Sequence, residues 1–190
     1  TKMLQLTDLD GDGRKDILFS ESNTNKIAWY KNLTNTTFGT EQVMTTNSLN
    51  VREIVGEDMN GDNTKDIVSV SYDDGNVAWY QNISGIGTFS PAKMVSYYAH
   101  FVNHIDVGDI NGDGTPDILS TSHADRKVAW YNNTNGLGDF SQPQQLISNT
   151  TNGTRNAYLR DMDGDGDLDA LYTYFLDENV DVFNIRWRAN

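Results

Sequence analysis

Apolar residues occur along this chain in short runs, and no segment keeps a helical period of 3.6 residues over ten positions. Gly, Asn, Asp and Ser separate the runs, which is the punctuation expected between β-strands. Four runs that directly follow aspartate-rich segments read ILFS, IVSV, ILST and ALYT, at residues 17–20, 67–70, 118–121 and 170–173. The pattern therefore predicts an all-β chain of short strands.

The aspartate-rich segments themselves form a four-fold repeat. They read DLDGDGRKD, DMNGDNTKD, DINGDGTPD and DMDGDGDLD, at residues 8–16, 58–66, 109–117 and 161–169. In the first three units a tryptophan follows the last aspartate by 13 residues, within IAWYKN, VAWYQN and VAWYNN. Each unit is predicted to hold one strand before the loop, one after it, one carrying Ala-Trp-Tyr and an outer one such as 42–44. Four strands per repeat of about 50 residues are typical of a β-propeller blade, with a β-solenoid as the alternative.

We expect a β-propeller-type array of four four-stranded blades with the last blade incomplete, forming a single domain over residues 1–190. The fourth unit has Val182 and Phe183 where the others have Trp-Tyr, and no fourth strand follows. An unpaired blade edge can pair with another chain, so we expect the residues before Asp8 to pair across a subunit contact. The approximate repeats are 1–49, 50–99, 100–151 and 152–190.

The spacing inside each aspartate loop predicts a cation site. In the first loop, positions 1, 3, 5 and 9 carry carboxylates and position 7 offers its backbone carbonyl, as in the first nine positions of an EF-hand loop. A strand follows instead of a helix, and the position-12 glutamate of an EF-hand is missing. Oxygen ligands without His or Cys favour Ca²⁺ over zinc or copper, and Mg²⁺ is less suited to an all-protein cage. The ligands of this loop are Asp8, Asp10, Asp12, Arg14 and Asp16.

The other three loops repeat this arrangement, with asparagine at position 3 in two of them. In the second loop Asn63 replaces the position-6 glycine, and asparagine tolerates the left-handed conformation needed there. One such loop could be a mere aspartate-rich turn, but four copies in register predict up to four calcium ions with a structural role. The ligands are Asp58, Asn60, Asp62, Thr64, Asp66, Asp109, Asn111, Asp113, Thr115, Asp117, Asp161, Asp163, Asp165, Asp167 and Asp169.

Charge and composition narrow the classes of partner. The formal net charge is −13, and 14 of the 27 acidic residues occupy the side-chain ligand positions of the four loops. This acidity argues against nucleic acid as a partner, and no apolar run approaches the ~20 residues of a membrane span. The chain has no cysteine, so calcium would take the place that disulfides have in other secreted domains. It begins at Thr1 without a signal peptide, so we expect a processed form or an excised fragment.

The pattern DxDGDGxxDIL, followed by VAWYxN and GxFS, resembles the FG-GAP/VCBS repeat of integrin-like β-propellers and of many secreted adhesins and lectins. The resemblance covers nearly the whole chain, and the aspartate loop is its most specific part. It implies a propeller of successive blades with calcium at the loop between the first two strands of each blade. Propellers of this family usually have more blades than the four repeats found here.

Two further groups of residues bear on function. Six N-x-S/T sequons predict glycosylation in a eukaryotic secretory pathway, at Asn32, Asn35, Asn82, Asn132, Asn149 and Asn152. Trp29, Trp79 and Trp130 could stack on sugars, but a tryptophan repeated at one strand position is more often packed between blades. We therefore expect these three tryptophans in the core.

The evidence for catalysis is thin. His100 and His104 lie near Tyr97 and Tyr98, a grouping that could serve a polysaccharide lyase as acid and base. It occurs in one repeat only and lacks a carboxylate partner, and the chain has no G-x-S-x-G or phosphate-binding glycine loop. We therefore expect a non-enzyme.

The sequence leaves three functions open. The first is a secreted calcium-binding glycoprotein that self-associates through an open blade edge as a structural subunit of an extracellular fibre or matrix. The second is an adhesion or carbohydrate-binding module of a larger secreted protein, with a glycan ligand. The third is the lyase. We rank them in this order.

Overall fold

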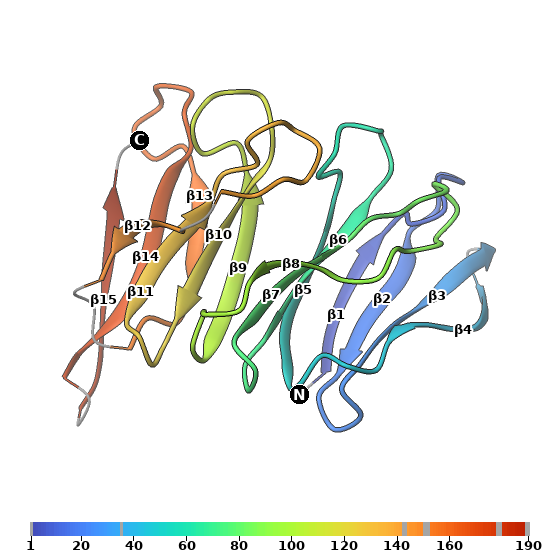
Figure 1. The fold of residues 1–190 in the computed structure, drawn as a ribbon, viewed down its shortest axis with the longest axis horizontal. Helices are drawn as coiled ribbons and strands as arrows, with labels where there is room; N and C mark the ends of the chain where they lie inside the picture. The colour runs from blue at the N-terminus through green and yellow to red at the C-terminus, as the bar shows by residue number, and fades with distance from the viewer. Residues whose placement is uncertain (1, 35, 142–143, 150–152, 178–179, 189–190) are drawn as a thin grey trace.

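The structure is a computed structural model that describes residues 2–34, 36–141, 144–149, 153–177 and 180–188. Four antiparallel sheets lie side by side in chain order, from the blue end of the chain to the red end (Figure 1). We call these sheets blades 1 to 4. The first and last blades lie at opposite ends of the row, so the described blades do not close into a ring.

The strands of each blade follow one another in sequence. Blade 1 holds β1 (Lys2–Thr7), β2 (Asp16–Glu21), β3 (Lys26–Thr34) and β4 (Thr37–Thr45). Blade 2 holds β5 (Val51–Glu57), β6 (Asp66–Ser71), β7 (Asn76–Tyr80) and β8 (Lys93–Ser96). Blade 3 holds β9 (Val102–Gly108), β10 (Asp117–Ser122), β11 (Lys127–Tyr131) and β12 (Gln145–Ser148). Blade 4 holds β13 (Ala157–Arg160), β14 (Asp169–Asp177) and β15 (Val180–Arg188).

The predicted all-β, propeller-type fold is confirmed, including the incomplete last blade. Blades 1 to 3 have four strands each, and blade 4 has three among the described residues. No helix in the described part of the chain is long and apolar enough to cross a membrane.

Strand pairing places the residues before Asp8 and corrects one expectation. β1 pairs with β2 along its full length, so the residues before Asp8 form the first strand of blade 1, and pairing of β1 with another chain stays a prediction. In blade 4, Leu171 pairs with Trp187, as Leu18 pairs with Trp29. The equivalent of the Trp-Tyr dipeptide therefore begins at Trp187, and the proposed match to Val182 and Phe183 was wrong.

The core lies between the blades, because strand side chains alternate between the two faces of each sheet. Leu18, Ile27 and Trp29 of blade 1 pack against residues from blade 2, among them Ile67 and Tyr80. Two further clusters fill the spaces between blades 2 and 3 and between blades 3 and 4. Each fully buried side chain of this size contributes about 1.5–3 kcal/mol to folding.

The repeated tryptophans largely follow the core prediction. Trp29 and Trp79 are buried, with 1% and 4% of their surface exposed. Trp130 is partly buried and packs against the cluster between blades 3 and 4.

Candidate metal sites in the aspartate loops

The first aspartate of each loop organises the turn around itself. Asp8 accepts hydrogen bonds from the backbone N–H groups of Gly11 and Gly13, each at 2.8 Å. Asp58 does the same with the N–H groups of Gly61 and Asn63, at 2.8 and 2.7 Å. Asp109 and Asp161 repeat these bonds in the third and fourth loops. The chain is thereby wrapped around the position-1 carboxylate.

Position 6 needs a left-handed backbone in all four loops. Gly13, Gly114 and Gly166 have φ angles of 84°, 85° and 98°. Asn63 has a φ angle of 65° at the same place, as the sequence predicts. Loop 2 therefore keeps the fold of the others without a glycine at position 6.

The last aspartate of each loop is buried where the second strand begins. Asp16, Asp66, Asp117 and Asp169 are at most 1% exposed. One carboxylate oxygen of each accepts the N–H of the loop's second residue, at 2.9–3.2 Å. Burial raises the pKa of Asp66 and of Asp117 to about 6, because the charged form loses its hydration. A cation beside these carboxylates would offset that cost.

Two of the loops bring three carboxylates close together. Oxygen atoms of Asp8, Asp10 and Asp16 lie within 4.8 Å of one another, and those of Asp161, Asp163 and Asp169 do likewise. In the other two loops the position-3 asparagines donate a hydrogen bond to the position-5 aspartates at 2.9 Å. All four donor sets consist of hard oxygen atoms, which fit Ca²⁺.

Two cationic side chains pair with the carboxylates of loop 1. Lys31 forms ion pairs with Asp10 and, at 3.3 Å, with Asp12. Arg14 also pairs with Asp12. A divalent ion in this loop would compete with both side chains for the same carboxylates.

The asparagine that ends each Trp-Tyr strand has a role that sequence reasoning missed. The N–H groups of Asn32, Asn82 and Asn133 each donate to the buried aspartate of their own blade at 2.8 Å. The recurrence of asparagine at this point of IAWYKN and its equivalents was the available signal.

The predicted glycosylation sites differ in how far their asparagine side chains are exposed. Asn82 is 1% exposed, and its side-chain nitrogen donates to the Leu9 carbonyl oxygen at 2.8 Å, which argues against a sugar there. Asn32 and Asn132 are partly buried, whereas Asn149 is exposed. Asn35 and Asn152 lie outside the described residues. Apart from Asn82, the glycosylation and calcium assignments stay predictions.

The residues considered for a lyase lie in different surroundings. Tyr97 and Tyr98 are 60% and 70% exposed, and His100 is also exposed. His104 is buried instead, with Nε2 3.6 Å from Glu53 Oε2 and its ring edge-on to Tyr158.

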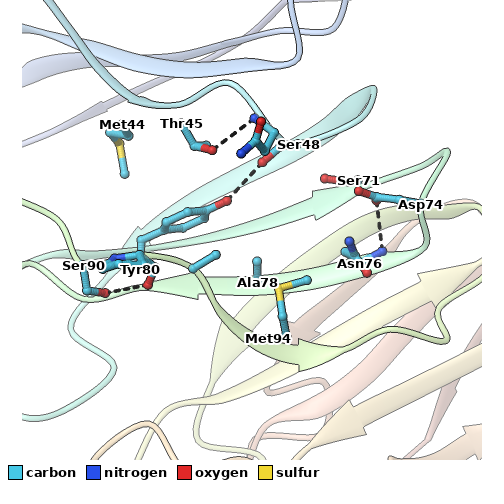
Figure 2. Close-up of a pocket in the computed structure, with 13 residues that line it drawn as sticks. Met44, Thr45, Ser48, Ser71, Asp74, Asn76, Ala78, Tyr80, Ser90 and Met94 are labelled. Atoms are coloured by element: carbon cyan, nitrogen blue, oxygen red, sulfur yellow. Dashed lines mark hydrogen bonds between the residues drawn. The ribbon is translucent and has the colours of Figure 1, made fainter.

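A pocket of about 220 Å³ lies between blades 1 and 2, and no sequence motif predicts it. Figure 2 shows the Tyr80 ring in this pocket with its hydroxyl group directed at Ser48. The two hydroxyl oxygens are 3.0 Å apart. The wall combines apolar and polar side chains, among them Met44, Asp74, Asn76 and Met94.

Comparison with known proteins gives a family and a fold. A family model described as FG-GAP-like repeat matches three overlapping stretches, residues 8–69, 58–120 and 109–172. No curated protein matches the sequence. A solved structure of an Agrocybe aegerita lectin, determined for its specific recognition of non-reducing terminal N-acetylglucosamine, is similar with a TM-score of 0.66 and 22% identity. The match covers 97% of this chain and 51% of the lectin chain, so the chain spans about half the length of that lectin.

Proposed function

Because the chain belongs to the FG-GAP-like repeat family, we propose that its four loops bind calcium and that the blades act outside the cell as a self-associating, non-enzymatic building block. Bound calcium would supply positive charge to the crowded carboxylates of each loop and hold the loop in one conformation. In every loop the side chains at positions 1, 3, 5 and 9 and the carbonyl at position 7 would hold the ion.

The main support for calcium binding is that the position-9 aspartate of each loop is buried next to a turn whose backbone N–H groups already bond to the position-1 carboxylate. Calorimetric titration of the chelator-treated protein should show Ca²⁺ uptake, and saturating Ca²⁺ should raise the melting temperature. Mg²⁺ at the same concentration serves as the control for a general charge effect. A melting temperature unchanged by Ca²⁺, with no heat of binding, would contradict the proposal.

Self-association is supported by an uncovered apolar face on blade 1. Leu4, Leu6 and Val43 are 64%, 52% and 53% exposed. Strand register places them on the face opposite to Leu18, which packs toward blade 2. The position in blade 2 that corresponds to Leu4 is Ile54, and it is buried in the core shared with blade 1.

This exposed face of blade 1 is thus equivalent to the face of blade 2 that packs against blade 1. On blade 1, no described blade covers it. We take the occupant to be blade 4 of a second copy, which would continue the stacking already seen between successive blades. Two copies joined in this way would present eight blades, which agrees with the chain's match to about half of a longer propeller-like lectin.

Sedimentation velocity tests this association. Leu6→Glu is expected to convert a dimer to a monomer, because it places a charge in the apolar contact. Leu137→Glu is the matched control, because Leu137 is 63% exposed but lies in a loop of blade 3. A wild-type chain that stays monomeric at high concentration would overturn self-association and assign this face to other blades of a longer protein.

Carbohydrate binding is a second candidate, favoured by the pocket between blades 1 and 2 and by the likeness to a lectin fold. The pocket offers polar groups from Ser48, Asp74 and Asn76 beside the Tyr80 ring, a combination suited to a small saccharide. Titration with N-acetylglucosamine is the direct test. Loss of binding in Asn76→Ala would support this function, and no heat with a broad set of monosaccharides would rule against it.

A further inference from the structure

The side chain of Asn82 joins the aspartate loops of two blades. Its backbone N–H donates to Asp66, the last ligand position of loop 2, at 2.8 Å. Its side-chain nitrogen donates to the carbonyl oxygens of Lys65 in loop 2, at 3.3 Å, and of Leu9 in loop 1, at 2.8 Å. Asn82 is 1% exposed, so water does not compete freely for these bonds.

Asn133 repeats the arrangement one blade further along. Its N–H donates to Asp117 in loop 3, and its side-chain nitrogen reaches the Met59 carbonyl oxygen in loop 2 at 2.7 Å. Asn133 is also fully buried. The same bridge therefore occurs at two successive junctions.

The two bridges link three loops into one hydrogen-bonded series. The N–H of Leu9 donates to Asp16 in loop 1, and the N–H of Met59 donates to Asp66 in loop 2. Leu9 and Met59 therefore each donate their N–H to the buried aspartate of their own loop. Their carbonyl oxygens each accept a bond from the asparagine of the next blade. Loops 1 and 2 also line one pocket together, with Gly11 and Thr64 among its residues.

We propose that Asn82 and Asn133 are positioning residues that couple neighbouring calcium loops, so that an ion bound in one loop favours binding in the next. This inference rests on the proposed calcium binding. The bridge forms fully only when the second residue of one loop and the last aspartate of the next are both in place. An ion that orders one loop therefore lowers the conformational-entropy cost of ordering the other loop. The effect is the same in both directions.

Blade 1 provides a matched control. Asn32 occupies the same position, donates to Asp16 through its N–H and to Lys15 through its side chain, and its described hydrogen bonds stay within blade 1. Both alanine variants keep the backbone N–H bond to the buried aspartate. Asn32→Ala removes only a side-chain bond within a blade, whereas Asn82→Ala also removes the side-chain bond between blades. Their difference isolates the coupling.

The experiment is a calorimetric Ca²⁺ titration of the full chain, produced in bacteria so that no sugar is added at any sequon. The wild type is expected to bind cooperatively, with a Hill coefficient above 1. Asn82→Ala and Asn133→Ala should each lower that coefficient and weaken the affected site about fivefold or more, the lower end of ordinary couplings. Asn32→Ala should keep the wild-type coefficient, which a merely structural role for this asparagine would not predict.

The outcomes separate this inference from the proposed function. No Ca²⁺ uptake by the wild type would end the calcium proposal itself. Uptake with a Hill coefficient of 1, or equal effects of Asn32→Ala and Asn82→Ala, would leave calcium binding in place and overturn the coupling. If Asn82→Ala does not fold, Asn133→Ala gives the reading at the other junction. If neither Asn82→Ala nor Asn133→Ala folds but Asn32→Ala does, the bridges serve stability alone, and this result would also contradict the coupling.

Discussion

Gly87 of blade 2 lies directly against the indole ring of Trp29 in blade 1. A Cβ atom built on this glycine would come within 2.2 Å of the Trp29 Cζ2 atom. Gly138 stands in the same relation to Trp79, at 2.4 Å. Each tryptophan thus fills the space beside the following blade so fully that only a glycine fits. The repeated tryptophan and the repeated glycine are two sides of one contact.

Gly87→Ala is therefore expected to lower the free energy of unfolding by about 3 kcal/mol. The φ angle of 81° costs alanine about 1 kcal/mol, and the overlap with the indole ring adds about 1–3 kcal/mol. Urea denaturation in the presence of a chelator measures the loss without a contribution from calcium. Gly61→Ala is the control, because Gly61 has a φ of 74° with no atom within 4 Å of its Cβ. Equal losses in the two variants would contradict the packing argument.

Lys31 of β3, which pairs with carboxylates of loop 1, gives a prediction about calcium affinity. Lys31→Ala is expected to raise the affinity of loop 1 for Ca²⁺ by up to about fivefold, because the ion no longer competes with an ion pair to Asp10 and Asp12. Calorimetry would show this as a gain at one site. Lys93→Ala changes the net charge equally but removes a pair with Asp139, away from the loops, and should leave the affinity unchanged. A gain in both variants would indicate a general charge effect.

The repeat made most of the fold and the crowding of the loop carboxylates predictable, because each loop fixes where a strand begins and which side chains lie close together. The fourth tryptophan was missed because the sequence was searched at a fixed spacing of 13 residues. Trp187 follows Asp169 by 18 residues, since the hairpin between β14 and β15 is longer. Aligning IRWRAN with IAWYKN would have found it.

Contacts between blades could not be predicted in the same way. Asn82 was interpreted as a sequon, yet its side chain bonds to Leu9, 73 residues earlier in the chain. Only the stacking of blade 2 on blade 1 brings these two residues together. The pocket beside Tyr80 depends on the same stacking, because its walls come from both blades.

Burial also predicts which sequons carry sugar. After expression in a eukaryotic secretory host, peptide mass spectrometry of the folded fraction is expected to find Asn149 glycosylated and Asn82 free of sugar. A glycan on Asn82 would replace one of the two side-chain N–H groups that bond to Leu9 and Lys65, and it would need space that the blade contact does not leave. Folded protein with a fully occupied Asn82 would contradict this placement.

Glu53 predicts how stability depends on pH. Burial raises the pKa of Glu53 to about 7, and the nearby Asp106 adds to the rise. The hydrogen bond that Glu53 accepts from the Ile105 N–H, at 3.0 Å, lowers the pKa by less than burial raises it. An unfolded glutamate has a pKa of about 4.3. Between these values the folded chain holds a proton that the unfolded chain has lost. The contribution of Glu53 to stability is therefore full below about pH 4.3, falls as pH rises toward 7, and is lost above that.

Glu53→Gln tests this contribution, because glutamine can still accept the Ile105 N–H bond but carries no charge. The stability of the variant relative to the wild type should rise by about 1–2 kcal/mol between pH 5 and pH 8, after allowance for solvent screening. Burial lowers the pKa of the adjacent His104, which disfavours its charged form. The aspartate loops are unchanged by the substitution, so their titration cancels in the difference between the two proteins. A stability difference that stays constant from pH 5 to pH 8 would mean that Glu53 is ionised in the folded chain and that its burial between the blades costs little.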